Sequence, residues 1–386
     1  MIRVEKLIPG GMGLGTDENG KKIFFWNALP GELVADFEPT KTKSHFTEAI
    51  ALKIINPSYH RITPKDTCYL STSPWQIMDY SFELAQKREL VVEIFREHQI
   101  PLPELSEIIT DGNDYFYRNK MEYALYWNNE VEKIELAFHT RGSHRKLPIK
   151  NSSIERPEIF TRAQEIIDDL NTRGEQARKY QSLLLRCDQS GKVSGGLYEN
   201  KKPHPHFETL SDKILGQTYS YSPNGFFQIN LPVYELALSE IKNQIATDSV
   251  LDLYAGVGTI GLSVAHDHKL TLVEVDKFAF SELEKNCQQF KNNSINPILE
   301  KSENVLNYIE PDQTVILDPP RAGCDKKLID KLFEIKPQKI IYLSCNPATQ
   351  ARDVKMLLEK YHLELIRAFN FFPRTPHIEN LVVLSL

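Results

Sequence analysis

The sequence predicts an α/β protein whose C-terminal part is a doubly wound, mostly parallel β-sheet. From about residue 245, strand-like runs alternate with helical stretches, which is typical of βαβ units. The predicted strands are 250–254, 270–275, 314–317, 339–343, 363–369 and 381–384. The last two lie too close together for a crossover helix, so we expect the final strand to pair antiparallel. Ligands are expected at the carboxyl ends of the parallel strands.

Two further parts precede this sheet. Residues 1–65 combine a glycine-rich turn at 8–15 with short strands at 23–26 and 31–37, which predicts a compact β-barrel. A mixed, strand-rich segment covers about 110–220. Its basic strip at 139–150 has four basic residues, two histidines and no acid, and is either an exposed loop or a phosphate-facing surface.

A helix is predicted between these parts, over residues 74–98. Pro74 suits the first helical position, and apolar residues such as Tyr80, Leu84 and Val91 then recur at steps of three or four and their sums. Pro101 and Pro103 end the helix.

Composition narrows the class of protein. The 386 residues carry 46 Lys and Arg against 52 Asp and Glu, a net charge of −6, with 41% hydrophobic and 25% charged residues. These values are typical of an ordinary globular protein. No apolar run reaches a membrane span, and the first ten residues lack the apolar block of a signal peptide, so we expect a cytoplasmic protein without a membrane partner.

Cysteine and histidine spacing argues against a structural metal site. The five cysteines form no CxxC pair, which excludes a zinc ribbon and a disulfide scaffold. The pairs His204/His206 and His266/His268 have no third ligand nearby in sequence, so we predict no metal.

The first motif with chemical content is DLYAGVGTIG at 252–261. Gly256, Gly258 and Gly261 form a GxGxxG between a strand and a helix, which lets backbone approach a nucleotide-like ligand. A dinucleotide and S-adenosylmethionine are both compatible with this pattern, and so is a plain packing turn. Glu274 ends the next strand, where a carboxylate can accept hydrogen bonds from ribose hydroxyls.

Two more polar positions follow strands. The Pro-Pro pair after Asp318 stops its strand and holds that carboxylate on a stiff loop. Cys345 lies between a strand and a helix predicted from Ala348, and a helix N-terminus is expected to lower the thiol pKa. The alternative is a buried, inert cysteine. Glu379 and His377 precede the last strand, where an exposed loop acid is the alternative for Glu379.

Taken together, these motifs resemble the RNA 5-methyluridine methyltransferases, which use S-adenosylmethionine to methylate carbon 5 of uracil in transfer or ribosomal RNA. Five blocks in order carry the resemblance: FFQIN at 226–230, DLYAGVGTIG at 252–261, ILDPPRAG at 316–323, SCNPATQARD at 344–353 and FPRTPHIE at 372–379. The glycine-rich start and LPGELV at 29–34 resemble a TRAM domain, an RNA-binding barrel. Residues 117–122 and 139–150 resemble the central domain of the family.

The resemblance implies a three-domain organisation. We expect an OB-like TRAM barrel at 1–65, a central α+β RNA-binding domain at 66–220, and a Rossmann-like class I methyltransferase domain at 221–386. Many family members carry four cysteines for an iron–sulfur cluster. Only Cys68 is present in the corresponding stretch, where Ser71 and Ser73 also lie, so we predict no cluster.

The resemblance also implies a mechanism. Cys345 is expected to add to carbon 6 of uracil, which makes carbon 5 nucleophilic, and Glu379 is expected to remove the carbon 5 proton after methyl transfer. Phe226 and Phe227 are expected to line the pocket of the flipped base. The residues expected to bind S-adenosylmethionine are Gln228, Tyr254, Gly256, Gly258, Thr259, Glu274 and Asp318.

Two other functions remain open from the sequence. Cytosine-5 methylation shares the cysteine addition, but it requires a group that holds the cytosine ring nitrogen and amine. A non-catalytic RNA-binding or folding protein would require neither Cys345 nor Glu379. The expected partner is a loop uridine of rRNA or tRNA, bound by a monomer without an obligate protein partner.

Overall fold

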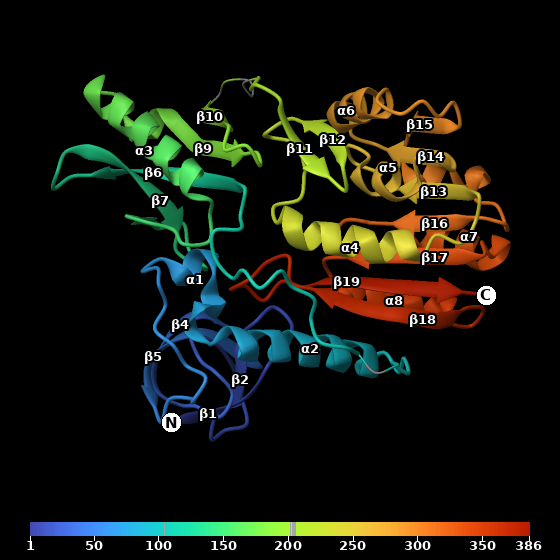
Figure 1. Ribbon diagram of the computed structural model, residues 1–386. Helices are drawn as coiled ribbons and strands as arrows, with labels where there is room; N and C mark the ends of the chain where they lie inside the picture. Colours follow the sequence, from blue (N-terminus) through green and yellow to red (C-terminus); the bar gives the residue numbers. More distant parts are fainter. Residues whose placement is uncertain (104, 201, 203–205) are drawn as a thin grey trace.

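The computed structural model describes residues 1–103, 105–200, 202 and 206–386, and Figure 1 shows them as three parts around one long helix. A barrel and a central sheet lie on one side, and a larger sheet lies on the other. His204 of the predicted histidine pair lies outside the described residues. Within the described part, no group of three or more His, Cys, Asp or Glu side chains is arranged to hold a metal ion.

The N-terminal strands form a closed barrel in the order β1-β2-β3-β5-β4, which confirms the predicted β-barrel. Side chains alternate along β3, where Ile23 and Phe25 are buried inside the barrel while Phe24 and Trp26 stay half-buried on its outer face. The five strands are β1 (Ile2–Leu7), β2 (Gly13–Thr16), β3 (Lys22–Trp26), β4 (Leu33–Thr42) and β5 (Phe46–Ile55).

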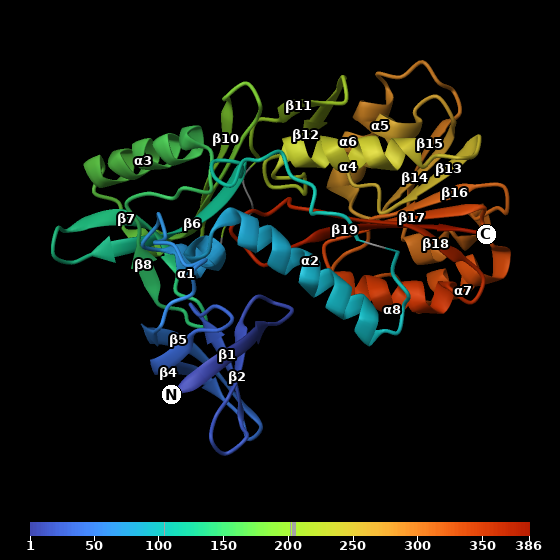
Figure 2. The same cartoon turned by 60° about the horizontal axis from the view of Figure 1, so that its bottom comes forward.

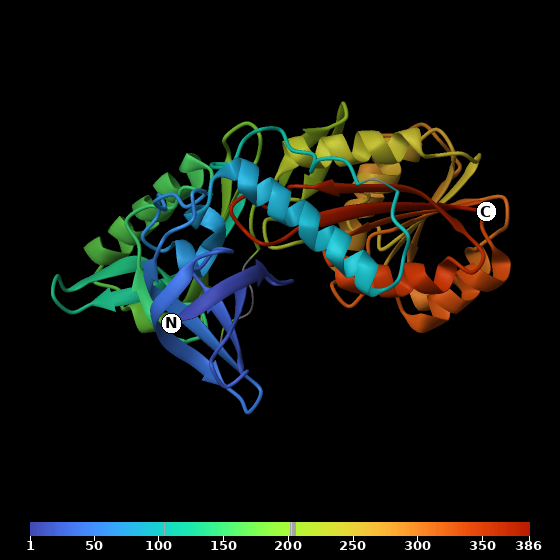
Figure 3. The ribbon, with the colours of Figure 1, turned by 90° about the horizontal axis from the view of Figure 1, so that it is seen from below.

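The helix predicted over 74–98 is shorter than expected. Pro74–Ile77 form a separate 3₁₀ turn (η1), preceded by the short α1 (Tyr69–Thr72), and α2 spans Tyr80–Glu97. Asp79 sets the true start because its side chain accepts a hydrogen bond from the Phe82 amide at 2.8 Å. Figures 2 and 3 show α2 running from the barrel along the C-terminal sheet, where it contacts α8.

The central part is an antiparallel sheet in the order β10-β9-β6-β7-β8, covered by one long helix. A separate hairpin, β11-β12, leads into the C-terminal part. These elements are β6 (Lys120–Asn128), β7 (Lys133–His139), β8 (Lys146–Pro148), α3 (Pro157–Thr172), η2 (Ala177–Lys179), β9 (Tyr180–Cys187), β10 (Val193–Glu199), β11 (Leu210–Ile214) and β12 (Gln217–Tyr221).

The C-terminal sheet has the order β15-β14-β13-β16-β17-β19-β18 and is the predicted doubly wound sheet. β19 is antiparallel to both β17 and β18, as predicted, and the other pairs are parallel. Its strands are β13 (Ser249–Leu253), β14 (Lys269–Glu274), β15 (Ile295–Leu299), β16 (Thr314–Leu317), β17 (Lys339–Ser344), β18 (His362–Phe369) and β19 (Glu379–Ser385). β15 was not predicted, because Pro297 and its half-exposed neighbours hide an edge strand.

Helices cover both faces of this sheet, with α4 on one face and α7 and α8 on the other (Figures 1 and 2). They are α4 (Leu231–Asn243), α5 (Thr259–Ala265), α6 (Lys277–Cys287), α7 (Lys326–Ile335) and α8 (Pro347–Leu357), with 3₁₀ turns η3 (Ser302–Asn304) and η4 (Leu306–Tyr308). Within the described ranges, no helix is long and apolar enough to cross a membrane.

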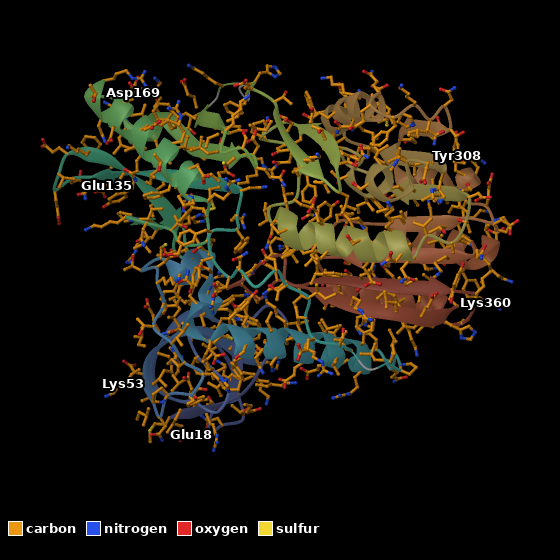
Figure 4. The ribbon with its side chains drawn as sticks, in the orientation of Figure 1. Glu18, Lys53, Glu135, Asp169, Tyr308 and Lys360 are labelled. Atoms are coloured by element: carbon orange, nitrogen blue, oxygen red, sulfur yellow. The ribbon has the colours of Figure 1, made fainter. Side chains whose placement is uncertain are left out.

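The orientation of the sheet places its carboxyl edge next to the other two parts. The C-terminus, which ends β19, lies at the far side of the sheet from the barrel, and the labelled Tyr308 and Lys360 lie at that same end (Figures 1 and 4). Because β17 runs antiparallel to β19, the carboxyl ends of the parallel strands point toward the barrel and the central sheet.

Candidate active site

Three predicted site residues meet at the carboxyl edge of the sheet. Asp318 directly follows β16, Cys345 directly follows β17, and Glu379 is the first residue of β19. β17 and β19 pair Ser344 with Asn380, so the same register places Cys345 opposite Glu379. Glu379 is only 4% exposed, which rules out the exposed loop acid that was its alternative, and Cys345 is half-buried rather than enclosed.

The N-terminus of α8 fixes the loop around Cys345. Asn346 caps the helix, with its side-chain oxygen accepting from the Ala348 amide at 3.3 Å. The Asn346 Nδ2 donates to the Arg321 carbonyl at 2.8 Å, and the Thr349 hydroxyl donates to that carbonyl at 3.2 Å. The Asp-Pro-Pro-Arg loop is therefore tied directly to the residue after Cys345.

The pKa of Cys345 was predicted to be lowered, and that prediction is wrong. Burial, with added repulsion from Glu379 and Asp318, raises the pKa of the Cys345 thiol to about 11. Arg321 opposes the shift through its charge and a hydrogen bond, but only in part. Desolvation and two nearby carboxyls thus outweigh the helix N-terminus, and the thiol is the stable form in the free protein.

The carboxyl groups of the site also hold protons more tightly than usual. Burial, followed by repulsion from Asp318, raises the pKa of Glu379 well above its ordinary value, although Arg321 opposes the shift. Burial raises the pKa of Asp318 to about 7. Asp318 can therefore exchange a proton near neutral pH.

His377 lies two residues before Glu379 among several cations. Burial, with added repulsion from neighbouring positive charges, lowers the pKa of His377 to about 4, so its ring is neutral at pH 7. The cations that act on it come from all three parts of the fold or the segments joining them: Arg321, Lys87, Arg118 and Arg141.

A buried amide pair connects the strands that carry Cys345 and Glu379. Gln350 of α8 donates through Nε2 to the carbonyls of Tyr342 at 2.8 Å and Asn380 at 2.9 Å. The Asn380 Nδ2 donates back to the Gln350 Oε1 at 2.6 Å. All three side chains are fully buried. This contact fixes the residue after Glu379 relative to the helix that follows Cys345.

The glycine motif forms a close-packed cradle between β13 and α5. Gly256 and Gly258 have left-handed φ values of +57° and +89°. A Cβ on Gly261 would lie 2.8 Å from both the Asp252 Oδ2 and a Leu272 methyl. The Gly261 amide donates to that Asp252 oxygen at 2.8 Å, so the backbone of α5 packs directly against side chains of β13 and β14.

Glu274 supports this cradle through backbone contacts. Its Oε2 accepts from the Gly256 amide at 2.8 Å, while its Oε1 accepts from Val275 and Asp276 at 2.8 and 2.6 Å. The remaining lone pairs of the carboxylate are what ribose hydroxyls would use, so ribose binding stays a prediction. Val275 and Phe278, beside it, are 54% and 77% exposed and offer an apolar surface suited to a purine.

The opposite side of the cradle contains buried polar atoms without partners. Asn230, which precedes α4, is fully buried, and neither of its amide atoms has a hydrogen-bond partner in the described part of the chain. One turn later, Tyr234 shares a hydrogen bond with Thr259 at 2.8 Å, which places this end of α4 against the cradle. The Asp252 Oδ1 is likewise unpartnered among the described residues. A bound polar ligand would satisfy such atoms.

The remaining predicted residues are Gln228, Tyr254 and Phe226, whose positions are compatible with the prediction, and Phe227, whose position is not. Gln228 is 7% exposed beside Asn230, and Tyr254 follows β13 with a φ of +68° at the same edge. Phe226 is 73% exposed and available to a ligand. Phe227 is 4% exposed and stacks on Tyr221 with 3.8 Å between ring centroids. It is therefore not free to line the pocket of a flipped base, contrary to the prediction.

Sequence reasoning missed three residues of this site. Arg321 lies within the ILDPPRAG block, so the sequence pattern could have indicated a positive charge near Cys345. Asn230 lies within FFQIN, but its burial has no local signature. Gln350 lies within SCNPATQARD, but its role depends on strand pairing, which no local pattern shows.

Cys68 is buried in the hydrophobic core of the central sheet, in the same core cluster as Cys187. Its thiol is 1% exposed and contacts the Asn151 carbonyl at 3.9 Å, and burial raises its pKa to about 12. Nearby, Asp66 accepts from the Ser153 hydroxyl at 2.6 Å and the Gln76 amide at 2.8 Å. All five cysteines are free thiols.

Comparisons with known proteins relate the chain to RNA methyltransferases. Residues 309–386, which contain Asp318, Cys345 and Glu379, match the tRNA (uracil-5-)-methyltransferase family. Uncharacterized RNA methyltransferases of Bacillus anthracis and Lactiplantibacillus plantarum are 27% and 28% identical, over the whole chain and 96% of each relative.

A solved structure shares the fold over the full length. It is the tRNA (uracil-54, C5)-methyltransferase of Pyrococcus abyssi in complex with S-adenosyl-L-homocysteine, with a TM-score of 0.77, 22% identity and complete coverage of both chains. The protein is therefore similar along its whole length to proteins named as RNA methyltransferases, and its residues 309–386 match the tRNA (uracil-5-)-methyltransferase family.

Proposed function

We propose that this protein transfers a methyl group from S-adenosylmethionine to carbon 5 of a uridine in structured RNA. The observation that carries the proposal is the strand register that sets Cys345 opposite the buried Glu379 at the carboxyl edge. Next to them lies a glycine cradle of the kind that binds adenosyl groups. The family match over residues 309–386 and the relatives named as RNA methyltransferases support this chemistry.

Cys345 starts the reaction as a nucleophile. Its sulfur adds to carbon 6 of uracil and the electron pair moves toward carbon 5, which then attacks the methyl group. Because the pKa of the thiol is about 11, a base must take its proton at neutral pH. Asp318, with a pKa of about 7, is the neighbouring group suited to this role.

Glu379 completes the reaction as a base. After methyl transfer, carbon 5 bears both a hydrogen and the new methyl group. The ionised carboxylate of Glu379 removes that hydrogen as a proton, the ring double bond reforms, and the sulfur of Cys345 leaves from carbon 6. A buried carboxylate with a raised pKa is a strong base once it is ionised.

The residues of the cradle fit S-adenosylmethionine, which supplies the methyl group and a positively charged sulfonium. Glu274 would hold the ribose, Val275 and Phe278 would cover the adenine, and Gln228 and Tyr254 would line the cavity. The unpartnered atoms of Asn230 and Asp252 are suited to the polar methionine end. The predicted roles of Gly256, Gly258 and Thr259 are to shape this cradle.

RNA contacts are proposed where the barrel meets the basic strip. Arg141 from the strip lies over the Trp26 ring at 4.1 Å, and its Nε donates to the Leu70 carbonyl. The same arginine is one of the cations that act on His377, next to the catalytic segment. An aromatic side chain flanked by cations suits a stacked base and its phosphate.

The test is labelled methyl transfer to RNA from cells that lack the gene. The proposal predicts that digestion yields 5-methyluridine, and that Cys345→Ala abolishes transfer while RNA binding survives. 5-Methylcytidine as the product would instead support cytosine methylation. RNA binding without any transfer would support a non-catalytic binding protein and contradict the proposal.

A further inference from the structure

The segment that carries Glu379 is held mainly from outside the C-terminal sheet. Residues 370–378 connect β18 to β19, and the strand register pairs Phe369, before this connection, with Glu379, after it. The connection leads directly into Glu379, the first residue of β19, so it sets how the chain enters that strand. The groups that hold its backbone come from α2, from η1 and from the segment before β6.

Two fully buried charges of α2 make the principal contacts. Lys87 donates through Nζ to the Asn370 Oδ1 at 2.6 Å and to the Phe372 carbonyl at 3.1 Å. Glu83 accepts from the Arg374 amide at 3.0 Å. The two side chains pair at 2.9 Å, and both are 0% exposed. A buried ion pair carries a desolvation cost, which the hydrogen bonds from this pair to residues 370–374 help to offset.

Further hydrogen bonds hold the backbone and side chain of Arg374 and its neighbour Pro373. Its φ of +62° is an uncommon backbone conformation for a residue other than glycine. The Trp75 amide donates to the Arg374 carbonyl at 3.0 Å, and the Tyr117 hydroxyl donates to the Pro373 carbonyl at 3.0 Å. The Arg374 guanidinium donates to the Met78 carbonyl at 2.6 Å and also pairs with Asp114.

We propose that Glu83 and Lys87 of α2, together with Tyr117, are positioning residues for Glu379. None of them reaches Glu379 itself in a recorded contact; they fix the backbone that delivers it. The inference rests on the proposed function, and it assigns part of the elimination step to residues of α2 and the central part. α2 starts beside the barrel and continues along the C-terminal sheet (Figures 1 and 3). The same helix therefore lies next to the barrel, where RNA is proposed to bind, and holds the segment that leads to Glu379.

Loss of this support should affect one step of the reaction more than the others. Addition of Cys345 and methyl transfer depend on β17 and α8, which the variants leave intact. Removal of the carbon 5 proton depends on the Glu379 carboxylate, and a displacement of about 1 Å costs a catalytic group about 100-fold in rate. A methylated, denaturation-resistant RNA–protein adduct should therefore accumulate in the variants.

The experiment is single-turnover transfer from labelled S-adenosylmethionine to RNA from cells that lack the gene, with separation of adduct from free methylated RNA. In Lys87→Met, we expect adduct formation within about threefold of the unaltered protein and release slower by about 100-fold. Tyr117→Phe removes one hydrogen bond and no charge, so it will fold, and it should slow release several-fold. The KM for RNA should change in neither variant.

Glu32→Gln is the matched control. Glu32 is also fully buried and ion-paired, with Arg61 at 2.6 Å, but it joins the barrel to the following segment instead of holding residues 370–378. It should lower the melting temperature without adduct accumulation. Two results would overturn this inference but not the proposed function. One is release of methylated RNA by folded Lys87→Met and Tyr117→Phe as fast as by the unaltered protein. The other is an equal slowing of release in Glu32→Gln. Absence of transfer by the unaltered protein would overturn the proposed function as well.

Discussion

The reactivity of Cys345 toward an alkylating reagent should rise steeply with pH. With a pKa of about 11, about one Cys345 thiol in 10,000 is ionised at pH 7. An ordinary cysteine of pKa about 8.5 would be about 3% ionised, so burial and the two carboxyls lower the thiolate population by about 300-fold. Each pH unit between 7 and 10 should therefore raise the alkylation rate about tenfold.

Replacement of Arg321 should move this profile in a defined direction. Its positive charge lowers the pKa of Cys345, so Arg321→Met should raise that pKa further and reduce alkylation at a fixed pH. A shift of one pKa unit corresponds to a tenfold slower reaction. Cys287 on α6 is the internal control, because burial and the nearby Glu284, rather than groups of the Arg321 loop, raise its pKa to about 11.

The assay is iodoacetamide labelling at pH 7 to 10, with the Cys345 and Cys287 peptides quantified separately by mass spectrometry. A Cys345 rate that is already maximal at pH 7 and flat to pH 10 would refute the reasoning, because it would mean a depressed pKa. An Arg321→Met profile that coincides with that of the unaltered protein would show that the arginine does not act on the thiol.

Three further predictions concern the base, the cradle and Cys68. Glu379→Gln should form the RNA adduct but fail to release it, so the adduct should survive denaturation on a gel; rapid turnover without adduct would assign the base elsewhere. Gly261→Ala places a methyl group 2.8 Å from Asp252 and Leu272, so it should destabilise the protein by about 1–3 kcal/mol. It should also weaken S-adenosylmethionine binding in calorimetry. Unchanged binding would contradict the proposal that the glycine cradle holds this ligand. Protein purified anaerobically should be colourless and free of iron, because a cluster takes four thiolates and the described part of the chain has no group of three or more His, Cys, Asp or Glu side chains arranged to hold a metal. Stoichiometric iron and sulfide would contradict the prediction.

The sequence predicted the C-terminal sheet because its strands are short, apolar and separated by helical stretches. The edge strand β15 escaped because Pro297 and its partly exposed residues lack that signature. The antiparallel final strand followed from chain length alone, since the gap after β18 is too short for a crossover. Local pattern therefore predicted six of the seven strands, including the edge strand β18, and missed only β15.

The candidate site was predictable in residue identity but not in its energetics. Cys345 and Glu379 stand next to predicted strands, yet their juxtaposition depends on a register that only the folded sheet defines. The predicted direction of the Cys345 pKa shift was wrong because segments distant in the sequence bury the thiol and bring Asp318 and Glu379 next to it. Lys87 contacts residues more than 280 positions later in the chain, and no local pattern encodes such a contact.

The most direct test of the central claim is a covalent trap. RNA in which 5-fluorouridine replaces uridine should react with the protein and S-adenosylmethionine, but the fluorine on carbon 5 cannot leave as a proton, so the adduct should persist. Peptide mapping of that adduct should find a methylated fluorouracil attached to the sulfur of Cys345. No adduct, or a nucleotide attached to a different residue while methyl transfer to ordinary RNA proceeds, would contradict the account.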